Sequence, residues 1–258
     1  MPQGRLNVVG TGYLVAGQTT PQALACIKRA EKLFYLIADP VTCAWIEDLN
    51  PSAESLADAY GADKERLDSY NEMVERMLAP VRGGLEVCAA LYGHPGVFAF
   101  PSHEAIRRAR REGFEAQMFP GVSAADCLFA DLGIDPSAGC QMYEATDFLQ
   151  RRRRFDPASP LILWQVGAIG ISTCPAALST TAGLRLLVEI LARDYPREHE
   201  VIVYEAAQLP VCRPKILRVA LAALPGAEVS GFSTLLVPPW GTAETDWEMV
   251  ERLAPRSA

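Results

Sequence analysis

The stretch that decides the fold opens with Ala-Leu-Tyr-Gly-His-Pro-Gly-Val-Phe at residues 90–98 and closes with Phe-Pro-Gly-Val-Ser-Ala-Ala-Asp at residues 119–126. The run just before it, at 85–91, is mostly apolar and has the length of a strand. The glycines and the proline that follow end a strand and let a backbone approach a ligand. The pattern therefore predicts a strand that ends in a binding loop.

A helix and a second strand are expected between these two loops. Ser102 can cap a helix over 102–113 with its hydroxyl, and the charges follow the helix dipole, with Glu104 early and four arginines later. A strand and a Gly-Val turn follow at 115–123. Two such loops from neighbouring parallel strands form a cleft at the carboxyl edge of a sheet, where ligands of α/β proteins usually bind.

The composition is that of a globular chain of 258 residues, enough for one domain or for two compact lobes. Hydrophobic residues make up 50% and charged residues 21%. The net charge of −7 argues against nucleic acid or an anionic membrane as the main partner. Since no apolar run has membrane-spanning length and the first residues do not resemble a signal peptide, we expect a cytoplasmic protein.

Metal and disulfide chemistry find little support in the sequence. The cysteines are odd in number and show no C-x-x-C spacing, and no two of the three histidines stand at a ligand spacing. We expect no metal site. We also expect small buried thiols in a reducing compartment at Cys26, Cys43, Cys88, Cys127, Cys140, Cys174 and Cys212.

The first half of the chain alternates strands with helices. The apolar run 6–9 ends in Gly10-Thr11-Gly12, as a strand does when it meets a tight turn, but Val15 replaces the third glycine of a dinucleotide fingerprint. Arg66 and Tyr70 stand four apart on an expected helix and so share a face, although a core tyrosine beside a solvated arginine is the simpler reading of that spacing. A further strand is expected at 32–37, and helices are expected at 20–30, with Thr20 as its cap, at 41–49 and at 63–81.

The second half repeats the alternation, which predicts an α/β fold of two lobes with a cleft between them. The lobes are expected at 1–118 and 119–240, followed by a tail at 241–258 with at most one short helix. The run Arg151–Arg154 can grip a phosphate or an acidic peptide, or can be a solvated surface. The expected elements are strands at 160–166, 200–204 and 231–237 and helices at 124–132, stopped by Gly133, at 183–193 and at 214–224.

Seven motifs are spread over residues 6–239. They are Gly10-Thr-Gly-Tyr, Tyr92-Gly-His-Pro-Gly-Val-Phe, Pro101-Ser-His, Phe119-Pro-Gly-Val-Ser-Ala-Ala-Asp-Cys-Leu-Phe, Tyr143-Glu-Ala-Thr-Asp-Phe-Leu, Gln165-Val-Gly and Ser233-Thr. Together they resemble the tetrapyrrole methylase-like, class III S-adenosylmethionine-dependent methyltransferases. Arg66, Tyr70 and Tyr92, with the run from Cys127 to Pro136, look most like the borosin peptide backbone α-N-methyltransferases within that group.

This resemblance implies a homodimer that binds S-adenosyl-L-methionine between its lobes, releases S-adenosyl-L-homocysteine and methylates main-chain nitrogens of a peptide. The best-known members of the group carry their substrate as a C-terminal extension, whereas this sequence stops soon after Trp240. The resemblance therefore implies a split type, in which a separate precursor peptide is bound in a heteromeric complex. Some members carry a tyrosine where Ala57 stands here.

The expected reaction requires an unusual nucleophile, since the lone pair of a peptide nitrogen is delocalised into the carbonyl group. A tyrosine can take up the amide proton if a nearby cation lowers its pKa. By the resemblance, Tyr70 with Arg66 beside it would polarise or deprotonate the amide, and Arg66 would stabilise charge on the carbonyl oxygen. Tyr60 would line the peptide channel, and Tyr92 would stand between cofactor and substrate.

The resemblance also implies a cofactor site of small, hydroxyl-bearing and loop residues from both lobes. Each has a simpler alternative: Ser123 as a helix cap, Val97 and Phe98 as core, and His94 as a loop residue bonded to the backbone. The expected set is Tyr92, His94, Val97, Phe98, Ser123, Ala124, Gln165, Ala206, Ser233 and Thr234.

Three other functions compete with peptide methylation. The first keeps the fold and methylates carbon atoms of a tetrapyrrole or corrin precursor, but those substrates carry many carboxylates and call for several basic groups. The second is a catalytically idle module that binds cofactor or precursor, against which the trio of Arg66, Tyr70 and Tyr92 argues. The third is a nicotinamide oxidoreductase, which the incomplete glycine motif does not favour.

Overall fold

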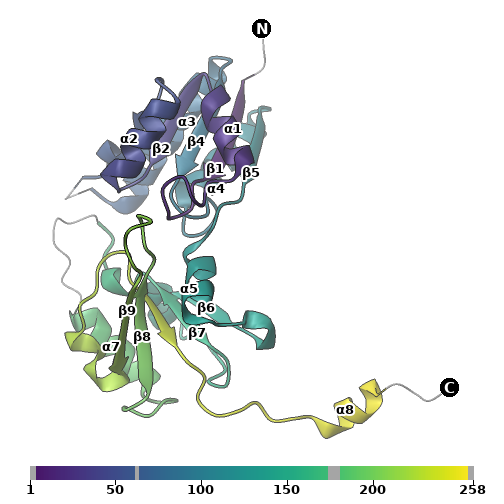
Figure 1. The fold of residues 1–258 in the computed structure, drawn as a ribbon, viewed down its shortest axis with the longest axis vertical. Coiled ribbons are helices and arrows are strands. Elements are labelled where there is room, and N and C mark those ends of the chain that lie inside the picture. Colours follow the sequence, from purple (N-terminus) through teal and green to yellow (C-terminus); the bar gives the residue numbers. More distant parts are fainter. Residues whose placement is uncertain (1–3, 62–63, 174–180, 255–258) are drawn as a thin grey trace. The chain divides into compact units, whose positions relative to one another are not determined.

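The computed structural model describes residues 4–61, 64–173 and 181–254 of a chain that divides into two compact units (Figure 1). The first unit holds the described residues of Met1–Ile134, Ile171–Leu178 and Glu205–Lys215, and the second holds those of Asp135–Gly170, Ser179–Tyr204 and Ile216–Ala258. The lobe boundaries expected from the sequence stay a prediction. Asp63, the expected start of a helix, and Cys174 lie outside the described residues. No described helix is long and apolar enough to cross a membrane.

A parallel sheet forms the centre of the first unit. Its strands lie in the order β3-β2-β4-β1-β5, and every neighbouring pair is parallel, as the sequence predicted. The expectation that β4 and β5 are neighbours was wrong, because β1 pairs with both and lies between them. The strands are β1 (Arg5–Gly10), β2 (Lys32–Leu36), β3 (Glu54–Ser55), β4 (Glu86–Leu91) and β5 (Glu115–Phe119).

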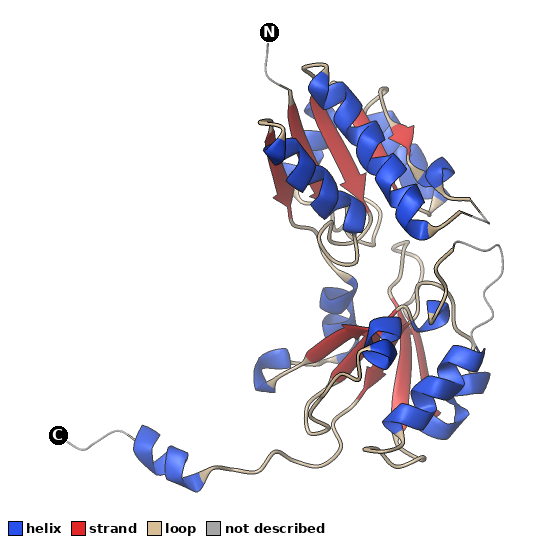
Figure 2. Ribbon diagram, turned by 180° about the vertical axis from the view of Figure 1, so that it is seen from behind, coloured by secondary structure: helices blue, strands red, loops and turns tan. Residues whose placement is uncertain are grey.

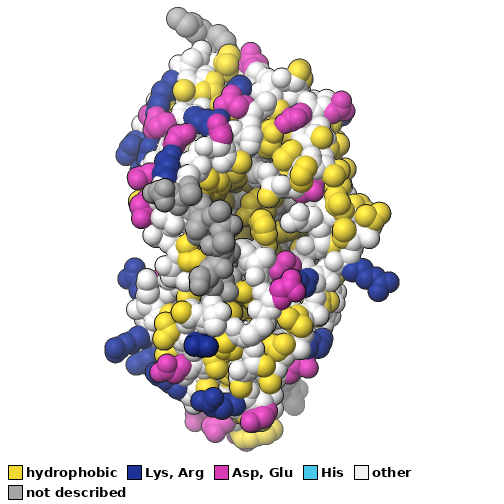
Figure 3. Space-filling view, turned by 90° about the vertical axis from the view of Figure 1, so that its left-hand side faces the viewer, with side chains coloured by type: hydrophobic (Ala, Val, Ile, Leu, Met, Phe, Trp, Pro, Cys, Tyr) yellow, Lys and Arg dark blue, Asp and Glu magenta, His cyan; other side chains and the backbone are white. Residues whose placement is uncertain are grey.

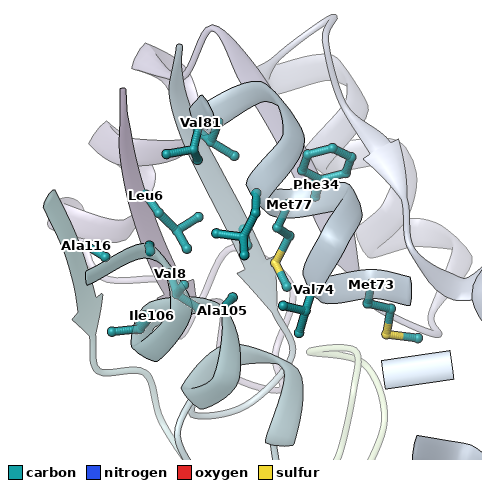
Figure 4. Close-up of a cluster of buried hydrophobic side chains, with 14 of the residues drawn as sticks. Leu6, Val8, Phe34, Met73, Val74, Met77, Val81, Ala105, Ile106 and Ala116 are labelled. Atoms are coloured by element: carbon teal, nitrogen blue, oxygen red, sulfur yellow. The ribbon is translucent and has the colours of Figure 1, made fainter. Parts of the chain in front are cut away.

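Helices cover both faces of this sheet (Figure 2). Alternate residues of β1 point to opposite faces: Leu6 and Val8 join the hydrophobic cluster under α3 and α4 (Figure 4), whereas Val9 joins the cluster under α1 and α2. Each helix therefore buries an apolar stripe on a sheet that is itself apolar on both sides. The helices on this sheet are α1 (Pro21–Arg29), α2 (Pro40–Leu49), α3 (Arg66–Arg82) and α4 (Phe100–Arg111), and the first unit also contains α5 (Ala124–Leu132).

The helix termini show which capping predictions hold. Thr20 caps α1 by accepting a hydrogen bond from the Ala23 amide at 3.1 Å, and Gly133 ends α5 in the left-handed conformation with φ 67°, both as expected. The prediction that Ser102 caps α4 was wrong. The helix begins two residues earlier at Phe100, with Pro101 in its first turn, and the buried Ser102 hydroxyl makes no hydrogen bond among the described residues.

The second unit contains a mixed sheet in the order β6-β7-β10-β8-β9. Strand β10 runs antiparallel to β7 and β8, while β6 runs parallel to β7. Its core packs α6 and α7 against one face of this sheet. The elements are β6 (Gln141–Glu144), α6 (Ala145–Gln150), β7 (Leu161–Trp164), α7 (Thr181–Leu191), β8 (Glu200–Glu205), β9 (Lys215–Ala220), β10 (Thr234–Val237) and α8 (Trp247–Leu253).

The helix expected at 214–224 was the main error in this unit. The structure has strand β9 there, followed by a 3₁₀ segment, Leu221–Gly226. Burial alternates along β9, and Leu217 and Val219 pack against the core, which is the period of a strand and not of a helix. Strand β6 and helix α6 were not predicted as elements, because each is only a few residues long.

Candidate active site

Four glycines bring the carboxyl ends of β1, β4 and β5 into contact. Gly12 and Gly93 exchange backbone hydrogen bonds of 3.2 and 2.9 Å across the two loops. A Cβ atom on Gly10 would lie 2.4 Å from the Gly93 oxygen, and one on Gly121 would lie 2.5 Å from the same atom. Only glycine allows so close an approach. The loop ends that the sequence placed at one sheet edge therefore do meet there.

The loop after β1 adds a tyrosine that the sequence did not single out. Tyr13 meets Tyr92 edge to face, with ring centroids 6.0 Å apart. Gln18 holds this loop, since its Oε1 accepts hydrogen bonds from the amides of Tyr13 and Leu14 at 2.7 and 3.1 Å, and its Nε2 donates to Cys127 Sγ at 3.5 Å. In the sequence Tyr13 was only the last residue of the motif Gly10-Thr-Gly-Tyr and was given no role.

Arg66 begins helix α3 and is held by the main chain of a distant segment. Its amide donates to the Ser172 oxygen at 2.9 Å and its Nη2 to the Thr173 oxygen at 3.1 Å. Its Nε atom is buried and makes no hydrogen bond with any described residue. A guanidinium N–H buried without an acceptor is costly, so this group has the capacity to bind an oxygen from a ligand.

Tyr70 lies one turn along α3 within a group of aromatic rings. Its ring stacks on Phe100 with a centroid distance of 5.9 Å and meets Tyr60 edge to face at 6.2 Å. Phe100, the first residue of α4, was not named from the sequence, because nothing in its local pattern indicates a contact with α3. The structure thus brings Tyr60, Tyr70 and Arg66 to one end of α3.

Tyr92 lies near both Tyr70 and Arg66, and these neighbours influence its acidity. Although Tyr92 is 40% exposed as a residue, burial of its phenol is the largest influence and raises its pKa; Tyr70 raises it further and Arg66 lowers it. Burial also raises the pKa of Tyr13. For Tyr92 the effect of the cation is smaller than that of burial, so this phenol keeps its proton at neutral pH.

Ser123 and Ala124 form the start of α5. The Ser123 hydroxyl and the Asp126 carboxylate make a capping box, in which Asp126 N donates to Ser123 Oγ at 3.2 Å and Ser123 N donates to Asp126 Oδ2 at 2.7 Å. The Ser123 hydroxyl also donates to Asp126 Oδ2. The helix-cap alternative for Ser123 is therefore confirmed, and Ala124 presents only a methyl group in the first turn.

The cofactor residues expected from the second half form a separate group. Gln165 directly follows β7 and has a left-handed φ of 56°, and the amide of the next residue, Val166, donates to the Ser233 oxygen at 3.2 Å. Ser233 Oγ accepts from the Ser230 amide at 2.8 Å, and Thr234 begins β10; both residues are buried. These three belong to the second compact unit, whereas Ala206 belongs to the first.

The arginine run at 151–154 follows α6 and is exposed. Arg151 and Arg153 pair with Asp147 at 3.5 and 2.6 Å. On the face drawn in Figure 3, basic and acidic side chains are interspersed over the surface. Among the described residues, no three His, Cys, Asp or Glu side chains gather closely enough to hold a metal ion.

Two solved structures share the fold of this chain. A uroporphyrin-III C-methyltransferase from Thermus thermophilus has a TM-score of 0.66 at 18% identity and covers 99% of this chain and 98% of its own. A cobalt precorrin-4 methyltransferase has a TM-score of 0.64 at 16% identity and covers 91% of this chain and 94% of its own. The expected tetrapyrrole methylase-like α/β fold is thereby confirmed.

Three relatives are much more similar in sequence. The gymnopeptides precursor methyltransferase of Gymnopus fusipes is 42% identical over 97% of this chain and 61% of its own length, and the omphalotin A precursor methyltransferase of Omphalotus olearius is 43% identical over the same shares. A type III borosin precursor methyltransferase of Anomoporia bombycina is 43% identical over 92% of this chain and 28% of its own. The chain thus spans about 61% of the length of the first two.

A family model described as tetrapyrrole (corrin/porphyrin) methylases matches residues 5–224. This match covers both sheets apart from β10 and includes every candidate site residue of the first unit. The chain is therefore a member of the tetrapyrrole methylase family of methyltransferases.

Proposed function

We propose that this protein transfers methyl groups from S-adenosyl-L-methionine to main-chain nitrogens of a peptide. Family members use this methyl donor, and the relatives that are 42–43% identical are named as methyltransferases joined to precursors of cyclic peptides. The observation that carries the proposal is Arg66 Nε, a buried donor with no acceptor among the described residues, next to the phenols of Tyr70 and Tyr92.

The residues present suit the methyl donor. The contact between Gly10, Gly93 and Gly121 brings three strand ends together without Cβ atoms, so that backbone is presented at this edge of the sheet. The paired rings of Tyr13 and Tyr92 offer aromatic faces of the kind that attract a sulfonium cation. The residues of the first unit that would hold the donor are Tyr92, Val97, Phe98, Ala124 and Ala206, while Gln165, Ser233 and Thr234 stay expectations from the sequence resemblance.

The side chains of α3 supply what the amide needs. When bound, the donor provides an electrophilic methyl group. Arg66 would donate to the amide carbonyl oxygen through Nε and stabilise the negative charge that develops there when the amide loses its proton. Tyr70 would accept or polarise that proton, while Tyr92, which burial keeps protonated, would act as a hydrogen-bond donor. Tyr60 would line the path of the peptide.

Assembly and substrate delivery stay predictions. The relatives carry methyltransferase and precursor in one chain, so a separate precursor stays an expectation, as does the homodimer that the sequence resemblance implies. The cytoplasmic location, which was expected from the sequence pattern, stays an expectation as well. A peptide added as a separate molecule tests whether the substrate is bound in trans. In that case the rate of methylation should depend on the concentration of the peptide.

Incubation of the purified protein with labelled donor and apolar peptides, followed by tandem mass spectrometry, tests the function. The proposal predicts methyl groups on main-chain nitrogens. Tetrapyrrole or corrin precursors serve as the competing substrate, and label on their carbon atoms in place of the peptide would contradict the proposal.

Two variants test the residue roles within the same assay. Tyr70→Phe and Arg66→Lys are expected to lower kcat by about 100-fold, which is the typical contribution of a general base or of one oxyanion donor, while donor binding persists. Tyr195→Phe and Arg111→Ala are matched controls that remove a phenol and a guanidinium outside the site, and their rates should equal that of the wild type. Unchanged rates in the first pair would refute the assignment.

A further inference from the structure

The loop between β4 and α4 contains a peptide group that two histidines hold from both sides. The Gly96 amide donates to His94 Nδ1 at 2.9 Å, and the Gly96 carbonyl oxygen lies 2.9 Å from His103 Nε2. His94 belongs to the loop itself, whereas His103 lies in the first turn of α4. One residue of the loop is thus fixed at both its donor and its acceptor.

These two contacts define which nitrogen of each ring carries a proton. His94 Nδ1 faces an N–H donor and must be unprotonated to accept it, while His103 Nε2 faces a carbonyl oxygen and must carry hydrogen. The two rings therefore have opposite roles on the same peptide. Gly96 is also the residue that lets the His94 ring come so near, because a Cβ atom there would lie 3.2 Å from His94 Cε1.

The segment that follows needs this support. The Val97 amide donates to the His94 oxygen at 3.1 Å, and Phe98 has a φ of 53°, in the left-handed region that a non-glycine residue adopts only when its surroundings hold it there. Val97 and Phe98 nevertheless expose 39% and 47% of their surface, although both side chains are apolar. The loop is thus a fixed turn that presents two apolar side chains outward.

We propose that His94 and His103 are positioning residues, which lock the Gly96 peptide and thereby hold Val97 and Phe98 in the conformation that receives the methyl donor. This inference rests on the proposed function. It gives His94 a different role from that expected from the sequence, since His94 acts through the loop and does not contact the donor. It also adds His103, an exposed residue that no sequence argument placed in the site.

Pairs of substitutions at each histidine separate positioning from direct contact. His94→Asn keeps an acceptor near the place of Nδ1, whereas His94→Leu removes it. His103→Gln keeps an amide N–H near the place of Nε2, whereas His103→Glu has similar length but offers a carboxylate, which cannot donate to the Gly96 carbonyl at neutral pH. Because His103 is exposed, its variants leave the core unchanged.

Two measurements on the full chain show how each substitution changes the loop and the binding of ligand. Hydrogen exchange of the segment 93–99 reports the loop without any ligand, and calorimetry with S-adenosyl-L-homocysteine reports the donor site. We expect His94→Leu and His103→Glu to speed the exchange and to weaken S-adenosyl-L-homocysteine binding by about three- to tenfold each, the scale of one lost hydrogen bond. His94→Asn and His103→Gln should stay within about twofold of the wild type. Since both histidines hold one peptide, the effects of the double variant should be less than additive.

The outcomes distinguish this inference from the proposed function. The positioning role is overturned if His94→Asn binds S-adenosyl-L-homocysteine as weakly as His94→Leu does, since a direct contact would need the ring itself. It is also overturned if hydrogen exchange of the loop is unchanged in His94→Leu and His103→Glu. Loss of binding without faster exchange contradicts it as well. If wild-type protein binds S-adenosyl-L-homocysteine and the loop responds as described but no peptide is methylated, the proposed substrate fails while the positioning role stands.

Discussion

At the scale of single residues, the site depends on positions where one added atom cannot be accommodated. Gly10, Gly93 and Gly121 come from three strand ends that are far apart in the sequence, yet their backbones touch. The atom nearest to a Cβ atom on Gly10 or on Gly121 would be the Gly93 main-chain oxygen, which cannot rotate away as a side chain can, whereas a Cβ atom on Gly93 would lie 3.0 Å from the Tyr13 ring. These glycines are therefore required by packing at the sheet edge, in addition to any ligand.

Gly121→Ala tests this contact. Its Cβ atom would lie 2.5 Å from the Gly93 oxygen and 2.8 Å from Gly10 Cα, so we expect the free energy of unfolding to fall by about 1–3 kcal/mol, the usual cost of overpacking. S-adenosyl-L-homocysteine should also bind more weakly. Gly226→Ala is the control, because nothing lies within 4 Å of a Cβ atom there. Equal stability of the two variants in urea denaturation would show that the sheet edge tolerates the added methyl group.

Tyr195 offers a second test that does not involve the site. Its buried hydroxyl has no hydrogen-bond partner among the described residues, and burial raises its pKa to about 12. Since the folded state favours the neutral phenol, its contribution to stability is complete below the ordinary tyrosine pKa of about 10 and is lost as the pH rises through about 12. Tyr195→Phe should therefore be at least as stable as the wild type at pH 7 and should lose less stability between about pH 10 and 12. Destabilisation at pH 7 would mean that the hydroxyl has a partner.

The sequence predicted residues whose role is local and missed those whose role depends on distant contacts. The caps at Thr20 and Ser123 follow from the few residues after them, and both are present. Tyr13 and Phe100 contact rings that lie far away in the chain, so no window of sequence contains the information. The orphaned Nε of Arg66 likewise depends on where the segment at 172–173 passes.

At the scale of elements, α3 carries the candidate catalytic residues and α4 holds it in place. Arg108 on α4 bonds to Glu104 on its own helix and reaches across to Glu75 and Asn71 of α3, at 2.6, 2.9 and 2.7 Å. The stack of Tyr70 on Phe100 lies between the same two helices. Movement of α4 would therefore displace the ring on which Tyr70 rests.

Arg108→Ala should loosen this pair of helices. We expect a loss of about 1 kcal/mol in stability, since solvent screens such half-exposed pairs, and a loss that shrinks in high salt. The rate of methylation should fall even at temperatures where the variant is fully folded. Arg107→Ala is the control, because Arg107 pairs only with Glu104 on its own helix among the described residues. If the two variants have the same activity, α4 does not position the site.

Helices and strands were predicted correctly where the hydrophobic pattern extended over many residues, and wrongly or not at all where it was short. Helix α3 and the buried strands of the first unit have patterns long enough to read. Residues 214–224 carry apolar side chains that fit both a helix and a strand, and only packing on the second sheet selects β9. The pairing of β1 with both β4 and β5 could not be read from the order of the strands in the sequence.

At the scale of the whole molecule, the chain combines a common fold with an unusual group of side chains. The fold is that of enzymes whose names refer to tetrapyrroles, but their identity of 16–18% supports the fold alone. The relatives at 42–43% identity carry peptide precursors in their names, and the chain spans about 61% of the length of the first two. The fold alone therefore does not identify the substrate, and the proposed peptide substrate rests on the cluster at the start of α3.

Ligand binding by the whole chain gives a check before any substrate is found. A ligand that binds only the folded state stabilises it by mass action, by about 2.7 kcal/mol at a concentration 100 times its dissociation constant. S-adenosyl-L-homocysteine should therefore raise Tm in a concentration-dependent manner, while a nicotinamide dinucleotide should not. The reverse result would contradict the proposal that the protein uses S-adenosyl-L-methionine as its methyl donor.

The most direct test of the central claim is tandem mass spectrometry of an apolar peptide incubated with the protein and isotope-labelled S-adenosyl-L-methionine. If Arg66 and Tyr70 activate a peptide nitrogen, the label will appear on main-chain nitrogens with the wild type and with Tyr195→Phe, and will nearly vanish with Arg66→Lys and Tyr70→Phe. Label on side chains or on a tetrapyrrole carbon, or full main-chain methylation by the two α3 variants, would contradict it.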